Sequence, residues 1–231
     1  MIEGAIVSMP VVSRKGIFFW LFRSLVTVRY TFFLTSVLLG LRTRSLTAIL
    51  VWVVVVFLAV LLHELGHAFA ARAFGQVPQI ELHAMGGLTR WAQIGELKWF
   101  QRVAISLAGP AMGFAAGGLL WVGGGFIPAS EPFVLTLARY DFLWVTLAWG
   151  VFNLAPMFPL DGAHALAEVA EHRLGPDRGQ HLAQQVSIAT GVAGFGVAIL
   201  LNETWLALVC ALFTFDNYQR MRGLPGVAFP R

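Results

Sequence analysis

The stretch SLTAILVWVVVVFLAVLLHELGH, residues 45–67, decides the fold of this chain. Its segment from Ser45 to Leu62 carries no charge and no histidine, and the helical pattern continues to about Arg72. About 20 mainly apolar residues allow a helix to cross a bilayer. The stretch therefore predicts a transmembrane helix whose end carries the two histidines and the glutamate of HELGH.

The composition of the whole chain predicts a membrane protein. Of its 231 residues, 58% are hydrophobic and 12% are charged, whereas a soluble domain has about 25% charged residues. These values exclude a disordered chain, a collagen-like chain and an ordinary soluble globule. The net charge of +4 comes from basic residues that flank apolar runs, so no nucleic-acid partner is expected. The single cysteine, Cys210, excludes an internal disulfide and a cysteine-cluster metal site.

Five further apolar runs bring the predicted number of spans to six. Three are long and uncharged, namely Val103 to Ser130, Phe142 to Leu160 and Leu182 to Asn202. Two are shorter, Tyr30 to Leu41 and Thr204 to Phe215, and need flanking residues, tilt or packing against neighbours to span. We therefore expect an all-α polytopic membrane protein with about six transmembrane helices.

The basic residues orient these spans, because cytoplasmic loops are enriched in Lys and Arg. With six spans and both termini in the cytoplasm, the outer side holds 3 of the 16 basic residues, and the cytoplasmic side holds the other 13. The three on the outer side are Arg42, Arg44 and Arg139. We expect no signal peptide and one membrane-embedded domain over residues 1–231, with a core at about 45–175 and C-terminal helices at 182–216. A prokaryotic cell membrane is the expected location.

Two segments have the alternating pattern of β-strands, Phe18 to Arg29 and Gln79 to Arg90. Strand backbone at membrane depth must be paired or must face water. We therefore predict that the two segments pair in a small β element at the cytoplasmic edge of the bilayer. The alternative is that they are loops and interfacial helix.

The HELGH motif has the spacing of a zinc site. On a helix, His63 and His67 share a face and can bind one Zn²⁺, while Glu64 can act as general base on a metal-bound water. Three ionisable groups at the end of an apolar helix cost several kcal/mol unless they serve a purpose. The alternative is a polar helix end that reaches the membrane interface.

A catalytic zinc needs a third protein ligand, and four residues are candidates: Asp161, His164, Glu168 and His83. Asp161 is favoured because its span and the HELGH span both run towards the cytoplasm. The prolines at 156 and 159 break the helix before Asp161, which lets the chain turn the carboxylate inward. The alternative is a helix-terminal Asp-Gly turn.

Two motifs together resemble the site-2 protease family of intramembrane zinc metalloproteases, peptidase family M50. They are HELGH and the N-x-x-P-x-x-x-L-D-G pattern at residues 153–162, and the resemblance covers roughly residues 18–175. It implies that His63, His67 and Asp161 bind Zn²⁺, that Glu64 is catalytic and that Asn153 lies near the substrate or the developing oxyanion. Gly86 and Gly87 resemble a glycine pair in the family's substrate-binding strand region, and Ala108-Gly109-Pro110 resembles its small-Gly-Pro element.

The resemblance also implies what the protein acts on. The expected substrates are transmembrane segments of other proteins, cut within the lipid bilayer in regulated intramembrane proteolysis, with the active site near the cytoplasmic side. The chain departs from the family in Ala163, where a second glycine often follows the Asp-Gly pair, and in the lack of an asparagine after Gly109-Pro110. We expect no PDZ or CBS domain, so a regulatory membrane partner could control substrate entry.

Two other functions compete with this one. In the first, the protein is a different membrane zinc protease that uses Glu168 as its third ligand. In the second, it is a catalytically inactive scaffold that binds membrane helices, although a pure binder has no need of Glu64. For the proteolytic function we further predict that the strand at Gln79 to Arg90 holds an unwound substrate segment by edge pairing.

Overall fold

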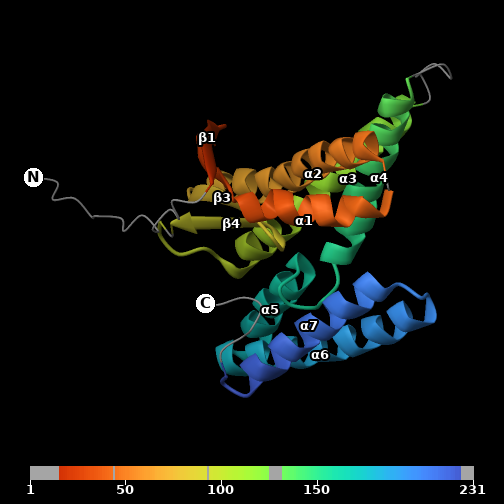
Figure 1. Ribbon diagram of the computed structural model, residues 1–231. Helices are drawn as coiled ribbons and strands as arrows, with labels where there is room; N and C mark the ends of the chain where they lie inside the picture. Colours follow the sequence, from red (N-terminus) through yellow and green to blue (C-terminus); the bar gives the residue numbers. More distant parts are fainter. Residues whose placement is uncertain (1–15, 44, 93, 125–131, 225–231) are drawn as a thin grey trace, which may run out of the picture. The chain divides into compact units, whose positions relative to one another are not determined.

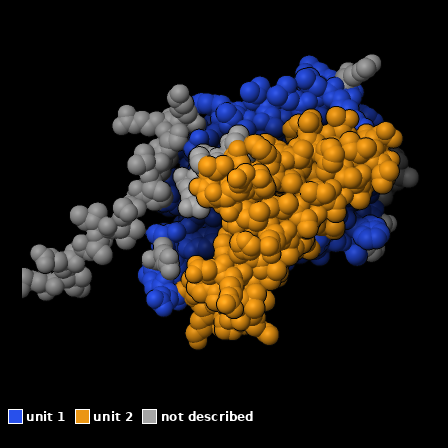
Figure 2. Space-filling model, turned by 90° about the horizontal axis from the view of Figure 1, so that it is seen from below, with its two compact units in different colours: residues 1–96, 111–149 blue, residues 97–110, 150–231 orange. Residues whose placement is uncertain are grey.

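The computed structural model describes residues 16–43, 45–92, 94–124 and 132–224. Within these ranges the chain forms seven α-helices, one short 3₁₀ helix and a four-stranded sheet (Figure 1). The expected small β element in a mostly helical chain is therefore confirmed. The chain divides into two units, coloured separately in Figure 2: residues 1–96 with 111–149, and residues 97–110 with 150–231.

The first unit is built around the helix that carries HELGH. This helix, α2, extends over Leu46–Ala73, so it includes the whole predicted span. It begins at Ser45, whose side chain accepts a hydrogen bond from the backbone N–H of Ala48 at 3.4 Å, a typical N-cap contact. The shorter helix α1, Tyr30–Gly40, packs along it (Figure 1), and the 3₁₀ helix η1, Leu41–Thr43, joins the two.

The sheet of the first unit has the strand order β1-β2-β3-β4. β1 and β2 form an antiparallel hairpin, β2 and β3 pair in parallel, and β3 and β4 form a second antiparallel hairpin. The strands are Ile17–Leu21, Ser24–Val28, Val77–His83 and Gly86–Ala92. Buried residues of β2, β3, α1 and α2 form one apolar core, made of Val26, Val28, Phe32, Leu61, Leu65, Ala68, Ile80 and Leu82.

The predicted pairing of the two strand segments is confirmed by β2 and β3, but each segment is a hairpin and not a single strand. In the first, Phe22 and Arg23 both have positive φ, 44° and 63°, as in the two-residue turns that join antiparallel strands. The usual Asn-Gly signal for such a turn is missing from this sequence. Arg72 contacts this turn, because its guanidinium donates to the Phe22 carbonyl and, at 2.9 Å, to the Ser24 hydroxyl.

Three helices among the described residues are long and apolar enough to cross a membrane: α2, α3 (Trp99–Gly124) and α6 (Pro176–Leu200). The chain is therefore a membrane protein, but the six predicted spans are not confirmed. α1 has 11 residues, which rise about 16 Å, roughly half of the hydrocarbon core. The end of the predicted span Val103 to Ser130 lies outside the described residues.

The predicted span at 142–160 differs from the helix in the structure. Helix α4 covers Phe133–Asn153, so it begins earlier and includes Arg139 and Asp141. The chain leaves the helix after Asn153 and remains non-helical up to Leu160. This interruption was expected from the prolines at 156 and 159.

The second unit contains three helices after this break. They are α5 (Asp161–Leu174), α6 and α7 (Thr204–Met221). Gly175, with φ of 86°, separates α5 from α6, and Pro176 begins α6. Helices α6 and α7 lie side by side as a hairpin, and α5 packs on α6 (Figure 1). The apolar core under the break consists of Met157, Leu160, Cys210 and Phe213.

Candidate metal centre

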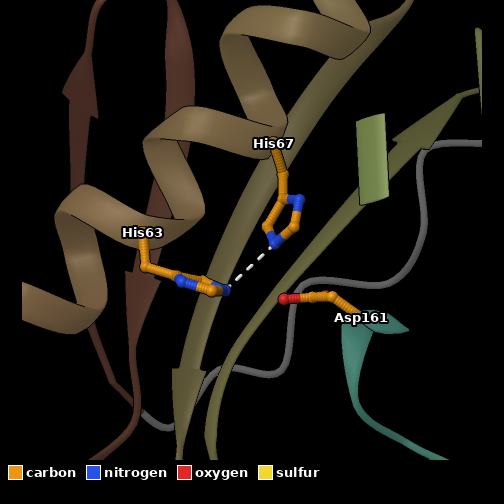
Figure 3. A group of neighbouring side chains, drawn as sticks. All are labelled: His63, His67 and Asp161. Atoms are coloured by element: carbon orange, nitrogen blue, oxygen red, sulfur yellow. Dashed lines mark hydrogen bonds between the residues drawn. The ribbon is translucent and has the colours of Figure 1, made fainter. Parts of the chain in front are cut away.

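The two histidines of HELGH lie one helical turn apart on α2 and point at each other. Their Nε2 atoms are 3.1 Å apart, as the dashed line in Figure 3 marks. Two nitrogen ligands at about 2.0–2.1 Å from a tetrahedral zinc lie about 3.3 Å from each other. His67 is buried and His63 half-buried. The pair therefore fits one zinc ion with little movement of either ring.

Glu64 lies between these histidines in the sequence and is 5% exposed. Its carboxylate is held from the sheet, because the hydroxyl of Thr89 on β4 donates to Glu64 Oε2 at 2.6 Å. The same hydroxyl oxygen lies 3.1 Å from the backbone oxygen of Glu64. The carboxylate of Glu64 thus has a fixed hydrogen-bond donor on β4.

Gly86 and Gly87 begin β4, and their surroundings differ. Gly86 has φ of 122° and no atom within 4 Å of the position of a β-carbon. A β-carbon on Gly87 would lie 2.6 Å from Cδ of Glu64. The backbone at Gly87 is thus in close contact with the glutamate side chain, and the predicted substrate-binding role of the two glycines stays a prediction.

Asp161 is the first residue of α5 and is half-buried. The loop before it is fixed at Phe158. The backbone N–H of Phe158 donates to the Ser187 hydroxyl at 2.7 Å, and its carbonyl accepts from Asn217 Nδ2 at 2.9 Å. Asn153, the predicted oxyanion donor, is the last residue of α4 and is half-buried.

The other candidate ligands have structural partners. At the end of β3, His83 accepts a hydrogen bond from Met85 N–H through Nδ1 at 3.2 Å, and burial lowers its pKa. His164 is exposed, and its ring packs edge-on against Phe158, with 5.0 Å between centroids. Glu168 forms an ion pair with Arg102 at 3.5 Å. Burial raises the pKa of Glu168, and Arg102 acts in the opposite direction.

The sequence reasoning missed three residues, Thr89, Ser187 and Asn217. Thr89 lies two positions after Gly87, and alternate residues of a strand share a face. A predicted strand that began at Gly86 would therefore have placed Thr89 on the same face as Gly87. The other two are polar residues inside apolar helices, where a polar side chain usually has a purpose. Nothing in the sequence identifies Phe158 as their partner.

The comparison with protein families matches residues 134–194 to peptidase family M50. A zinc metalloprotease of Methanocaldococcus jannaschii is 28% identical over 72% of this chain and 48% of its own length. A relative from Synechocystis sp. is 30% identical over 69% of this chain and 44% of its own length. The chain thus spans about half the length of the curated relatives it matches.

A solved structure matches along almost the whole chain. The site-2 protease from Methanocaldococcus jannaschii is similar with a TM-score of 0.62 and 25% identity, over 93% of this chain and 99% of that one. These comparisons support the site-2 protease family, peptidase family M50, for this chain. The named metalloprotease relative, together with two histidines and an aspartate as donors, identifies zinc as its metal.

Proposed function

We propose that the protein is an intramembrane zinc metalloendopeptidase that hydrolyses peptide bonds in or near transmembrane segments of other membrane proteins, as in regulated intramembrane proteolysis. The observation that carries the proposal is the His63–His67 pair, whose Nε2 atoms converge to 3.1 Å beside the buried Glu64. This pair lies on α2, which is apolar enough to cross a membrane. Zinc ligands and a general base on such a helix favour hydrolysis at membrane depth.

For the metal ligands we propose His63, His67 and Asp161. Each offers one ligand atom, and three protein ligands leave one position open for water in a catalytic zinc site. Asp161 is supported over Glu168, because the carboxylate of Glu168 has Arg102 as its ion-pair partner. The two hydrogen bonds to the backbone of Phe158 fix the loop that leads into α5, of which Asp161 is the first residue.

The chemistry of the site divides between the metal and the chain. Bound zinc lowers the pKa of water to about 7 and polarises a carbonyl oxygen. Glu64 accepts the proton of the attacking water and then donates it to the leaving amine nitrogen. Asn153 stabilises the developing oxyanion with its side-chain amide, and loss of such a donor lowers the rate by about 10² to 10³.

A substrate helix must unwind before it can be cut, because its carbonyls are hydrogen-bonded within the helix. The predicted segment Gln79 to Arg90 contains parts of two strands: β3, which has neighbours on both sides, and β4, which is an outer strand of the described chain. We therefore propose that the edge pairing takes place at β4, which carries Gly86 and Gly87. An extended peptide gains its affinity there from backbone hydrogen bonds.

The proposed topology has six spans, both termini in the cytoplasm and the active site near the cytoplasmic side of the bilayer. The 13 basic residues on the cytoplasmic side of this arrangement support it. We retain the proposal of one membrane-embedded domain over residues 1–231. The lipid bilayer and a membrane protein substrate are the proposed partners, with a further membrane protein as a candidate regulator.

The proposal is tested with purified protein in detergent and a panel of single-span membrane substrates, with cleavage sites mapped by mass spectrometry. We expect cuts inside or next to the transmembrane segment, lost on chelation and restored by zinc. Cuts confined to soluble tails would contradict the intramembrane assignment. Zinc-loaded protein that cuts none of the panel would favour the scaffold function.

A further inference from the structure

We propose that Gly87 and Thr89 of β4 are positioning residues that together form a seat for the carboxylate of Glu64. The inference rests on the proposed role of Glu64 as general base. The two seat residues are two positions apart on one strand, so they face the same side of the sheet. Thr89 supplies a hydrogen-bond donor, and Gly87 supplies space.

The Thr89 contact selects one oxygen of the carboxylate. A threonine hydroxyl has a single proton to donate, and its contact of 2.6 Å with Glu64 Oε2 is shorter than the 3.1 Å contact with the backbone oxygen. Oε2 is therefore the oxygen that accepts the hydrogen bond, while Oε1 lies against the backbone of Gly87. Without this bond the carboxylate would rotate and spend less time in the reactive orientation.

The lack of a side chain at Gly87 leaves the space that the carboxylate of Glu64 occupies. A β-carbon at this position would lie 2.6 Å from Glu64 Cδ, closer than real β-carbon contacts. The three atoms nearest to it, Cγ, Cδ and Oε1, all belong to the flexible side chain of Glu64. An alanine at 87 would therefore displace the carboxylate and leave the backbone of the strand in place.

The seat is anchored in the core of the first unit. Gly87 pairs with Leu82 of β3, and Thr89 pairs with Ile80. Both partners are core residues, with exposures of 0% and 1%. The apolar packing that fixes β3 therefore fixes β4, and through it the orientation of Glu64 on α2.

The test compares Thr89→Val, Thr89→Ser and Gly87→Ala with wild type, measuring kcat, KM and bound zinc. Thr27→Val is the matched control, since Thr27 is a buried threonine of the same sheet, on β2. Hydrogen bonds to charged groups have effects of about tenfold to hundredfold. We expect Thr89→Val and Gly87→Ala to lose kcat by this factor, with unchanged KM and zinc content, while Thr89→Ser and Thr27→Val stay near wild type. A wild-type kcat in Thr89→Val, or a kcat in Thr89→Ser as low as that in Thr89→Val, would contradict the proposed role of Thr89.

A second readout does not depend on activity. In a double-mutant cycle, the thermal midpoint is measured for wild type, Thr89→Val, Glu64→Ala and the double variant. We expect Thr89→Val to lower the midpoint of the wild type more than that of Glu64→Ala, in which the hydroxyl keeps only the backbone oxygen of residue 64 as a partner. Equal shifts in both backgrounds would show that the two side chains are not coupled. The cycle keeps its meaning if no substrate is cleaved, so failure of the seat and failure of the proposed function are distinguishable.

Discussion

The hydroxyl of Ser187 on α6 accepts a hydrogen bond from the backbone N–H of Phe158, with 2.7 Å between the two atoms. On α7, Asn217 binds the carbonyl of the same residue through Nδ2 at 2.9 Å. Ser187 and Asn217 are 0% and 1% exposed. The C-terminal helical hairpin thus holds both backbone polar groups of a residue that lies shortly before Asp161.

This relationship predicts that Ser187 affects metal binding without touching the metal. Ser187→Ala removes the acceptor of a buried N–H, so the loop before Asp161 loses one of its two fixed points. We expect zinc affinity to fall about tenfold, at the lower end of what residues behind metal ligands contribute. Competition with a chromophoric chelator measures it. Ser36→Ala is the control, because Ser36 is a buried serine of α1 that bonds within its own helix. Equal zinc affinity in both variants would contradict the prediction.

The third ligand is predicted to be Asp161 and not Glu168. Asp161→Ala should lose most of its zinc on dialysis, because two histidines alone hold the metal weakly. Glu168→Ala should keep its zinc and lose only the ion pair with Arg102, an effect of about 1 kcal/mol or less for a partly exposed pair. Metal content by mass spectrometry distinguishes the two variants. The reverse pattern would establish the glutamate-ligand alternative.

Edge pairing of the substrate on β4 predicts a position-dependent effect of proline. Backbone N–H groups at Leu88 and Trp91 point to opposite edges of the strand, so one of them faces β3 and the other faces away. Leu88→Pro and Trp91→Pro are therefore compared, and the one that removes the N–H facing away from β3 should keep wild-type zinc content and thermal stability. This variant should raise KM for membrane substrates. Phe18→Pro, on the opposite outer strand β1, should not. Unchanged KM in all three variants would rule out pairing at β4.

Some of this arrangement could be predicted from the sequence because it depends on local spacing. The i and i+4 positions of His63 and His67 bring the two rings together on any helix, and the apolar run before them defines α2. Pro156 and Pro159 predict the interruption before Asp161.

The rest depends on tertiary contacts. The turn at Phe22 and Arg23 has no Gly or Asn to reveal it, and Arg72, far away in the sequence, contacts it. Thr89 reaches Glu64 only because β3 and β4 pair in one register. Local hydropathy alone also does not determine the number of spans, because α4 carries Arg139 and Asp141 inside the helix.

The measurement that tests the central claim most directly is zinc content and peptide-bond cleavage on the same preparations of wild type, Glu64→Gln and the exposed control Glu203→Gln. We predict that all three retain zinc. Cleavage should fall at least about a hundredfold in Glu64→Gln alone, the usual minimum for loss of a general base. Wild-type cleavage in Glu64→Gln, or no cleavage by zinc-loaded wild type, would contradict the account.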